Sequence, residues 1–521
     1  MRFAGFFDRL YECEHVGSVS TPKTSALRNM ATEAELEKIV EIAGHGGYNV
    51  VILLVSSTIH LAATLDLLSF CVTAPAASCD LQLGMAEISL LTSIPFAGYV
   101  SALPWGYYAD MHGRRRAILV SASVGSILGI MTSFASSFTM MLVLKFLGCT
   151  FSTACITLTI TYLGECTCSK YRTKYMFILN CFNLGSDLVC YALAYFILRM
   201  EFNVDIPWLA ISYRPWRLFT LSMSLMLGAG AVMMFFLHES PKFLANKGDV
   251  DQALHVLKTA YGVKEGTEEL VTNSLLFADK KLDSTKTTFW NSVVQQTVPI
   301  FQPPLLIHTV QLFFLLSVCC STNNVFFMWF PTMVNSFFNS IASDDSSFCD
   351  RITSNITTTI ENNVVCDSTI SNATIFSGMA FSTFFTIVNY GTSLISNYRK
   401  SVLIITLTIA GLSTVIVDLI YQPIISILLF ILIQLAGVSG GNVCSYFNDV
   451  YPTTYRGLGT SLGSMTARIS SMIGVYIVGS TIVDHCRITF FAWSIFVFVG
   501  VAAAWSLPAE KKKLNPSTDP S

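Results

Sequence analysis

The chain has 521 residues, and its 31 Lys and Arg nearly balance its 33 Asp and Glu. Charged residues make up 12% of the chain and hydrophobic residues 52%, whereas about 25% of an ordinary soluble protein is charged. So few charges cannot cover the surface of a soluble protein of this size, and the neutral balance provides no basic field for nucleic acid. The composition therefore excludes a soluble enzyme, a disordered chain and a nucleic-acid binder, and it predicts a protein that crosses the lipid bilayer many times.

Twelve apolar stretches are each long enough to cross a bilayer as a helix, which takes about 20 residues. Six of them precede a long polar stretch and six follow it, which predicts an all-α polytopic membrane protein. The predicted spans lie near 50–76, 86–109, 117–137, 139–164, 175–198, 216–237, 307–333, 374–396, 400–420, 423–450, 457–484 and 487–507.

These spans predict how the chain is organised. The predicted segments are a cytoplasmic N-terminal segment (1–49), an N-terminal six-helix bundle (50–237), a cytoplasmic central loop (238–306), a C-terminal six-helix bundle (307–507) and a cytoplasmic tail (508–521). The central loop is expected to begin with two short helices, because Ser240 and Asp249 each stand where an N-cap residue would precede helical spacing.

The distribution of basic residues predicts the orientation. The termini and short connections on one side hold 17 Lys and Arg, against 5 on the other side, so both termini are expected in the cytoplasm. The outer loop, 334–373, carries glycosylation sequons at Asn355 and Asn372, which require a luminal or extracellular face. Cys349 and Cys366 in the same loop either bond to each other or remain free thiols. The membrane is either the plasma membrane or that of an intracellular vesicle.

The two halves share a pattern of Tyr-x2-acid-x6-Arg at the cytoplasmic end of the fourth span of each half. It comprises Tyr162, Glu165 and Arg172 in the first half, and Tyr446, Asp449 and Arg456 in the second. Equal spacing at equivalent positions is what a duplicated six-helix unit produces.

The loop after the second span carries a more specific pattern of glycines and charges, made of Gly106, Asp110, Gly113, Arg114 and Arg115. With this pattern the chain resembles the major facilitator superfamily. The resemblance implies twelve helices in two six-helix bundles, a central cavity and alternating access, with these cytoplasmic charges and those of the repeated pattern forming a gate. The corresponding second-half loop, 396–400, lacks the acid and the glycine.

Further motifs narrow the resemblance. The stretch His238-Glu-Ser-Pro-Lys-Phe243, the pair Trp216-Arg217, and Trp329-Phe-Pro331 are similar to those of sugar porters and of the synaptic vesicle glycoprotein 2 and two-related protein group. Two positions depart from the family pattern. Lys145 stands where the superfamily usually has Arg, and Ser69 stands where vesicle glycoproteins have a second acid.

Two acids and two bases that lie deep inside predicted spans are candidate functional residues, because a charge is costly there. They are Asp66, Asp187, Lys145 and Arg468. Either acid is a candidate proton-coupling or cation-binding carboxylate, and Arg468, which matches a basic position of organic-ion transporters, is a candidate for binding an anionic group. The alternative is a static structural pairing of the two acids with the two bases.

Aromatic residues add candidates for the lining of a mostly apolar site. The family resemblance places Trp329 at the cavity, and Tyr195 is a second candidate, although packing is the alternative for each.

We interpret the chain as a secondary active transporter that moves a small charged organic solute, coupled to H+ or another ion. The alternative is a non-transporting vesicle glycoprotein, a receptor or trafficking regulator, on a transporter scaffold. We expect a monomer without a cofactor or metal, since Cys166-Thr-Cys168 has no second ligand pair at zinc spacing. We expect no enzyme, because the sequence has neither a Gly-x-Ser-x-Gly nor a His-Glu-x2-His motif.

Overall fold

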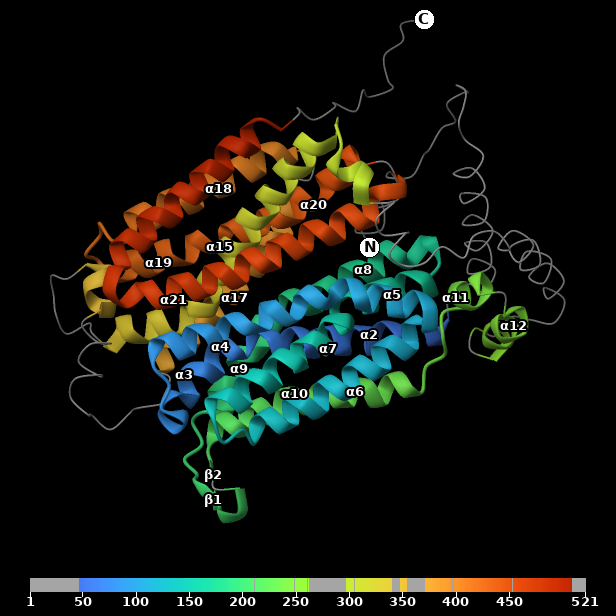
Figure 1. Cartoon of the computed structure of the whole chain (residues 1–521), viewed down its shortest axis with the longest axis horizontal. Coiled ribbons are helices and arrows are strands. Elements are labelled where there is room, and N and C mark those ends of the chain that lie inside the picture. Colours follow the sequence, from blue (N-terminus) through green and yellow to red (C-terminus); the bar gives the residue numbers. More distant parts are fainter. Residues whose placement is uncertain are drawn as a thin grey trace, which may run out of the picture.

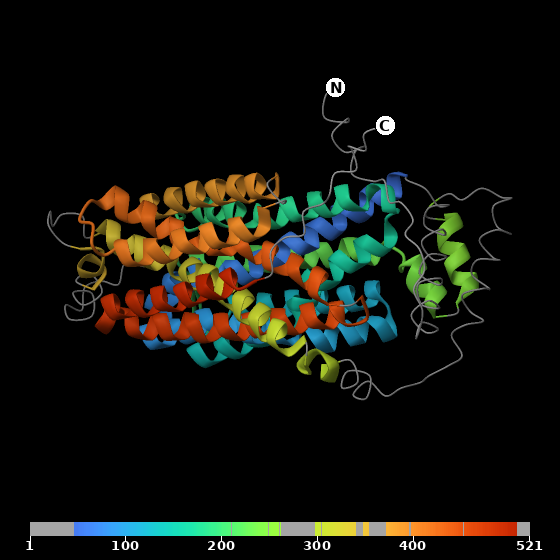
Figure 2. The same ribbon diagram turned by 90° about the horizontal axis from the view of Figure 1, so that it is seen from above.

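The computed structural model describes residues 46–507, apart from 262–296, 340–346, 354–370, 395–397 and positions 210, 248, 260, 304 and 452. Its long helices lie along one common axis, with the first half of the chain beside the second (Figure 1). Two short helices, α11 (Pro241–Asn246) and α12 (Val250–Thr259), lie beyond the spanning helices at one end (Figures 1 and 2). We call this the α11–α12 end, and the other the opposite end.

The helices of the first half follow the predicted spans, with breaks. They are α2 (Gly47–Leu68), α3 (Phe70–Leu81), α4 (Met85–Gly98), the 3-10 turn η3 (Tyr99–Ser101), α5 (Ala102–His112), α6 (Arg114–Ser133), α7 (Phe138–Cys166), α8 (Ser169–Leu184), α9 (Ser186–Ile197) and α10 (Pro215–Phe235). The first predicted span is broken at Ser69, the second at η3 and the fifth at Gly185.

The helices of the second half also follow the predicted spans, with breaks. They are α15 (Leu305–Asn339), which follows the 3-10 turn η5 (Val298–Phe301), then α17 (Asn372–Leu394), α18 (Arg399–Ile416), α19 (Pro423–Ile433), η7 (Gln434–Gly437), α20 (Val438–Val450) and α21 (Thr453–Trp505). The last two predicted spans both lie in α21, whose regular geometry is interrupted at His485.

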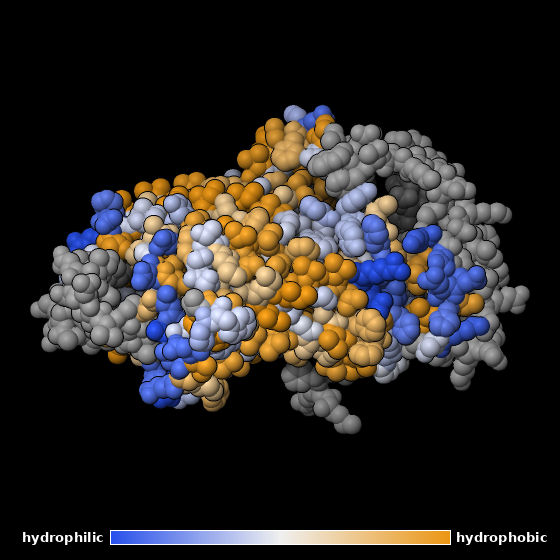
Figure 3. All heavy atoms as spheres, turned by 60° about the horizontal axis from the view of Figure 1, so that its bottom comes forward, coloured by the Kyte–Doolittle hydropathy of each residue, from blue (hydrophilic) through white to orange (hydrophobic). Residues whose placement is uncertain are grey.

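Ten helical segments among the described residues are long and apolar enough to cross a membrane. One of them, Leu458–Trp505, contains two predicted spans, and α17 coincides with the predicted span 374–396. All twelve predictions therefore coincide with helices, and the predicted fold class is confirmed. The surface agrees, since an apolar band separates two hydrophilic ends (Figure 3).

The two short helices of the central loop are also confirmed. The Ser240 hydroxyl accepts a hydrogen bond from the Phe243 amide at 3.3 Å, and the Asp249 carboxylate accepts one from the Gln252 amide at 3.4 Å. Sequence reasoning missed a small antiparallel hairpin, β1 (Val204–Ile206) and β2 (Ile211–Tyr213). Its strands have three residues each, too few for a periodic pattern to reveal them.

The buried core is distributed unequally along the common axis. Near the α11–α12 end each half has its own cluster of buried apolar residues, one including Leu158 and Tyr162 and the other Leu316 and Tyr446. A third and larger cluster joins both halves through α3, α4 and α9 on one side and α15, α17 and α21 on the other. The halves are therefore packed together toward the opposite end, and each has a separate core toward the α11–α12 end.

Candidate functional site

Asp66 and Lys145 form an ion pair inside the first half. The Lys145 Nζ lies 2.8 Å from an Asp66 carboxylate oxygen and donates a second hydrogen bond to the Asp66 carbonyl at 2.6 Å. The break at Ser69 follows three residues later, and the Ser69 hydroxyl also donates to that carbonyl, at 3.2 Å. The ammonium also lies 4.4 Å from the centre of the Phe70 ring. Both charges are thus compensated within one bundle, rather than between the halves.

Arg468 lies where the two halves meet. It belongs to α21, and its guanidinium lies 4.9 Å from the ring centre of Tyr99 in η3 of the first half. Tyr99 is fully buried, and its hydroxyl donates to the carbonyl of Ala63 at 3.2 Å. Within the described part of the chain Arg468 has no acidic partner and no hydrogen bond. The guanidinium is therefore positioned on an aromatic face with its donors uncommitted.

Close helix packing places Tyr99 at this point. A side chain at Gly98 would meet Cys149 and the backbone of α7 at 2.7 to 2.9 Å, so only glycine lets α4 approach α7 this closely. Sequence reasoning missed Tyr99 and Phe70 because neither is charged. The signal that could have revealed Tyr99 is its place directly after a Pro95-x2-Gly98 break within a predicted span.

Asp187 lies in the first turn of α9, directly after the break at Gly185. Among the residues that the structure describes, its carboxylate has neither an ion pair nor a hydrogen-bond partner. The predicted pairing of two acids with two bases is therefore only half realised. Asp66 takes Lys145, whereas Asp187 and Arg468 have no charged partner in the described residues.

The two predicted aromatic residues are not gathered with these charges. Trp329 is 1% exposed and donates its indole N–H to the Val475 carbonyl at 3.0 Å, so it is enclosed in the cluster that joins the halves. Tyr195 accepts a hydrogen bond from Arg199 at 2.7 Å and packs on Phe376 of α17. Both positions favour the packing alternative in this conformation.

Three of the predicted gate residues of the first half, Asp110, Arg114 and Glu165, form one network at the α11–α12 end. Arg114 lies 2.9 Å from Asp110 and 3.0 Å from Glu165, and it stacks on Phe243 of α11 at 5.1 Å. Arg172 donates to the carbonyl of Thr167 at 3.4 Å. The network ties the α5–α6 turn to the end of α7 and to α11.

The two glycines of this loop differ in their surroundings. Gly113 has φ +103°, a conformation that side chains rarely adopt, and an added Cβ there would meet the Glu239 carboxylate and the Phe243 ring. Gly106 lies inside α5 with open space around it. Only Gly113 is therefore required by the local geometry.

The second half provides a different set of contacts at this end. Arg399 donates to the Ser445 hydroxyl at 2.9 Å and lies 5.2 Å from the Tyr446 ring centre. Asp449 and Arg456 belong to α20 and α21, but their side chains lie outside the described residues, so the gate across the halves stays a prediction.

The structure corrects both alternatives for Cys349, which is neither bonded to Cys366 nor a free thiol. Cys349 bonds to Cys486 of α21, 137 residues further along the chain, and not to Cys366. The two Cα atoms are 5.7 Å apart, which fits the usual geometry of a disulfide. No sequence signal links Cys486 to Cys349, because Cys486 lies between two predicted spans, far from the loop in sequence. Cys366 and the sequon at Asn355 lie outside the described residues, whereas Asn372 is exposed at the start of α17.

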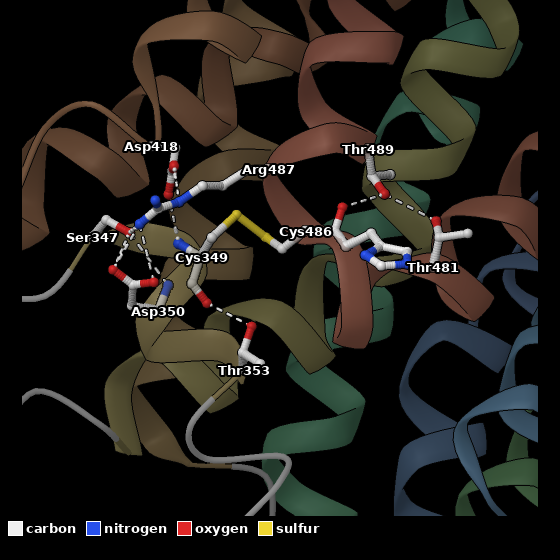
Figure 4. Close-up of a disulfide and its surroundings, with 10 residues drawn as sticks. Ser347, Cys349, Asp350, Thr353, Asp418, Thr481, Cys486, Arg487 and Thr489 are labelled. Carbon is white, nitrogen blue, oxygen red and sulfur yellow. Dashed lines mark hydrogen bonds and ion pairs between the residues drawn. A yellow bond between two sulfur atoms is a disulfide. The ribbon is translucent and has the colours of Figure 1, made fainter.

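Charged residues surround this disulfide (Figure 4). Arg487 lies 2.9 Å from Asp350 and 3.1 Å from Asp418, and Asp418 accepts a hydrogen bond from the Cys349 amide at 2.9 Å. The cluster fixes the residues after α15 to the start of the last predicted span and to the end of α18.

Comparisons with known proteins agree with this architecture. Synaptic vesicle glycoprotein 2C of Mus musculus is 25% identical over 279 residues, which are 48% of this chain and 38% of that protein. The match thus spans well under half of that relative. Synaptic vesicle 2-related protein of Xenopus laevis is 23% identical over 491 residues, which are 92% of this chain and 81% of that protein.

Solved structures share the fold. The inward open conformation of the xylose transporter XylE from E. coli superposes with a TM-score of 0.64 at 15% identity, covering 89% of this chain and 98% of that one. An inward-facing bacterial homologue of the human lysosomal transporter Spinster has a TM-score of 0.61 at 12% identity, covering 89% and 97%.

The family itself is identified by sequence. The family model of the Major Facilitator Superfamily matches residues 56–341, which is more than half of the chain. Together with the twelve helices in two halves, this match establishes that the chain is a multi-pass membrane protein that belongs to the Major Facilitator Superfamily.

Proposed function

We propose that this protein is a secondary active transporter for a small organic solute that carries an anionic group. The observation that carries the proposal is the position of Arg468, on the Tyr99 ring at the junction of the halves and without an acidic partner among the described residues. An uncommitted arginine in the membrane interior needs an anion to compensate it, and a guanidinium recognises carboxylate or phosphate groups with two parallel hydrogen bonds.

The distribution of the core supports alternating access. The halves share buried residues toward the opposite end and have separate cores toward the α11–α12 end. We propose that residues 50–237 and 307–507 are the two units that rock, and that the conformation described here faces the α11–α12 end. The cytoplasmic charges around Arg114 would then meet the second half in the alternate state.

Asp187 is the residue we propose for ion coupling. Asp66 is already neutralised by Lys145, whereas Asp187 has no partner in the described residues and can therefore gain or lose a proton or a cation without breaking an ion pair. A protein of the same fold, described as a D-xylose-proton symporter, supports the choice of a proton as the coupling ion.

We propose that both termini and α11–α12 face the cytoplasm, and that the opposite end faces the outside or a vesicle lumen. The disulfide and the exposed Asn372 at that end support this sidedness, because both chemistries belong to non-cytoplasmic compartments. We propose a monomer that performs transport and no catalysis. Loss of the glycosidase-sensitive mass in an Asn355→Gln/Asn372→Gln variant tests the sidedness.

The decisive experiment measures ligand binding and flux with variants of Arg468. A thermal-shift screen of organic anions, organic cations and sugars identifies the ligand class, since a ligand that binds the folded state stabilises it. We expect stabilisation by an organic anion, loss of at least tenfold in affinity for Arg468→Gln, and partial retention for Arg468→Lys, because breaking a charge-assisted contact costs about 1.5–3 kcal/mol. Arg487→Gln is the matched control, since it removes an arginine of the same helix α21 at the opposite end.

Two outcomes would contradict the proposal. Stabilisation by cations only, or unchanged affinity in a folded Arg468→Gln variant, would show that Arg468 does not form an anion-binding site. Coupling is tested in liposomes, where Asp187→Asn should abolish acceleration of uptake by an imposed proton gradient and retain exchange of solute. Uptake that ignores every imposed ion gradient would refute coupling.

A receptor or trafficking protein on a transporter scaffold is the second candidate. Two positions favour it, Ser69 in place of a second acid and the second-half loop 396–400 without the acid of the first. That candidate predicts ligand-induced stabilisation without flux in liposomes, whereas the transporter predicts both.

A further inference from the structure

A pocket of about 420 Å³ lies on the first half at the α11–α12 end, apart from the junction where Arg468 lies. The α5–α6 turn, the end of α10 and the α11–α12 pair form its walls. The helices beside it, α6 and α10, pack mainly on each other and on α2 and α7, all of the first half. The pocket shares Arg115 and Phe243 with the predicted gate region, but the proposed transport site does not use it.

The pocket contains cations that no acid neutralises. Arg115, Arg116 and Lys247 line it, and none of them forms an ion pair among the described residues. The buried Nε of Arg115 has no hydrogen-bond partner, although another nitrogen of the same guanidinium donates to the Phe235 carbonyl at 2.6 Å. The pocket therefore holds three cationic side chains, and one nitrogen of Arg115 has no hydrogen-bond partner.

The two acids in the pocket wall are already committed to the backbone. Glu239 accepts hydrogen bonds from the amides of Arg115, at 2.9 Å, and Ser240, at 3.1 Å. Asp249 caps the start of α12. Because both carboxylates are held by amide groups, they are not placed to pair with an ammonium or guanidinium group in the pocket.

One of these cations, Arg115, acts on a neighbouring residue. Burial first, then the charges of Arg115 and His255, lower the pKa of His238, which lies outside the spanning segment. An anion that enters the pocket would be attracted by the same field.

The rim of the pocket connects it to the bilayer. Phe235 and Phe236 line it at the end of the spanning helix α10, and they are 61% and 74% exposed. Hydrophilic residues gather at this end of the molecule next to the apolar band (Figure 3). A ligand here can therefore place a charged group among the cations while an apolar part lies against the two phenylalanines, as a membrane lipid would.

We propose that this pocket binds the phosphorylated headgroup of an anionic membrane lipid. The class that fits is a phosphoinositide, because its phosphomonoester groups carry close to two negative charges each and accept hydrogen bonds from several donors at once, which Arg115, Arg116 and Lys247 can supply together. The choice uses the proposed cytoplasmic location of the α11–α12 end. A bound headgroup would contact the α5–α6 turn, α10 and α11 at once and tie them together.

The test uses the full-length protein in nanodiscs of phosphatidylcholine that contain a small fraction of phosphatidylinositol bisphosphate or of phosphatidylserine. Bound lipid is counted by native mass spectrometry, and affinity is measured with a fluorescent phosphatidylinositol bisphosphate. The test variant is Arg116→Gln/Lys247→Gln, since both side chains are exposed and hold no other described group. The control is Lys170→Gln/Lys174→Gln, which removes two cations beside Tyr171 on α8, outside the pocket.

We expect the bisphosphate lipid to bind in preference to phosphatidylserine and to lose about tenfold or more in affinity in the pocket variant, since each basic residue near a membrane contributes about 1 kcal/mol. The control variant should bind as the parent does. Equal binding of both lipids, or equal loss in both variants, would show a nonspecific surface charge and overturn the proposal. An affinity for soluble inositol trisphosphate equal to that for the lipid would show that the apolar part contributes nothing, and would overturn the choice of a lipid in favour of a soluble anion.

Discussion

At the scale of single residues, the charges inside the membrane have different roles. Asp66 and Lys145 neutralise each other through an ion pair, and Lys145 donates a further hydrogen bond to the backbone. Their main role is therefore structural. Arg468 and Asp187 have no charged partner in the described residues and remain free to act on a ligand or an ion. A shared location inside spans therefore does not imply a shared role.

The pair of Asp66 and Lys145 gives a prediction about stability. Asp66→Asn or Lys145→Met alone leaves one buried charge uncompensated, and each should cost about 3 kcal/mol. The double variant removes both charges and should recover most of that loss. Thermal unfolding of the purified proteins in one detergent measures the three values, and losses that simply add in the double variant would contradict a direct pair.

The two glycines of the α5–α6 region give a second prediction. Gly113→Ala forces a side chain into φ +103° and against Glu239, which should cost about 2 kcal/mol. Gly106→Ala, in open helical space, should be neutral or slightly stabilising, because alanine favours a helix by up to about 1 kcal/mol over glycine. The unfolding temperatures of the two variants test this difference. Equal changes in both would show that the turn geometry is not what requires glycine.

At the scale of elements, breaks within helices position the candidate site. The break at Ser69 exposes the Asp66 carbonyl to Lys145, and the turn η3 places Tyr99 under Arg468. The opposite end relies instead on a covalent bond, since the disulfide and Arg487 together hold the segment after α15 against α18 and α21.

The disulfide predicts a specific response to substitution. Cys486→Ser should lower the unfolding temperature, corresponding to about 2 kcal/mol, because the bond closes a long loop, and Cys349→Ser should cause the same loss. The Cys349→Ser/Cys486→Ser variant should lose no more than either single variant. Cys181→Ser, at an exposed free cysteine, is the control. A double variant that loses the sum of the two would contradict the pairing.

At the scale of the whole molecule, the halves are joined by one shared core toward the opposite end. Gly479 of α21 lies at this junction, where an added Cβ would overlap Trp329 of the second half and Ser89 of α4 in the first. The closeness of this packing makes the closed side sensitive to a single added side chain.

Gly479→Leu should therefore open the shared core and favour the conformation that faces the opposite end. A cysteine introduced at Leu91, which is buried in that core, should react faster with a membrane-impermeant thiol reagent in the Gly479→Leu background than in the parent. Gly474→Leu is the matched control, since its side chain would meet Trp493 and Val325, both within the second half. Equal labelling in the two glycine variants would indicate general loosening and not opening between the halves.

The sequence predicts the features of this fold that depend on local signals. The twelve spans follow from runs of apolar residues, and the helix pair after α10 follows from its caps, so both are readable one segment at a time. The pairing of Asp66 with Lys145, the contact of Tyr99 with Arg468 and the enclosure of Trp329 depend on helices that are distant in sequence, and no periodic pattern reports which faces meet.

The sparse charge of this chain by itself determined that it is a membrane protein of twelve helices in two related halves, because the bilayer requires apolar spans and excludes most charges from them. The tertiary structure alone decided which of the few remaining charges neutralise each other, that Cys349 bonds to Cys486, and that Arg115, Arg116 and Lys247 surround one pocket. The physical reason is distance, since ion pairs, disulfides and pockets act over a few ångströms in space and are indifferent to separation along the chain.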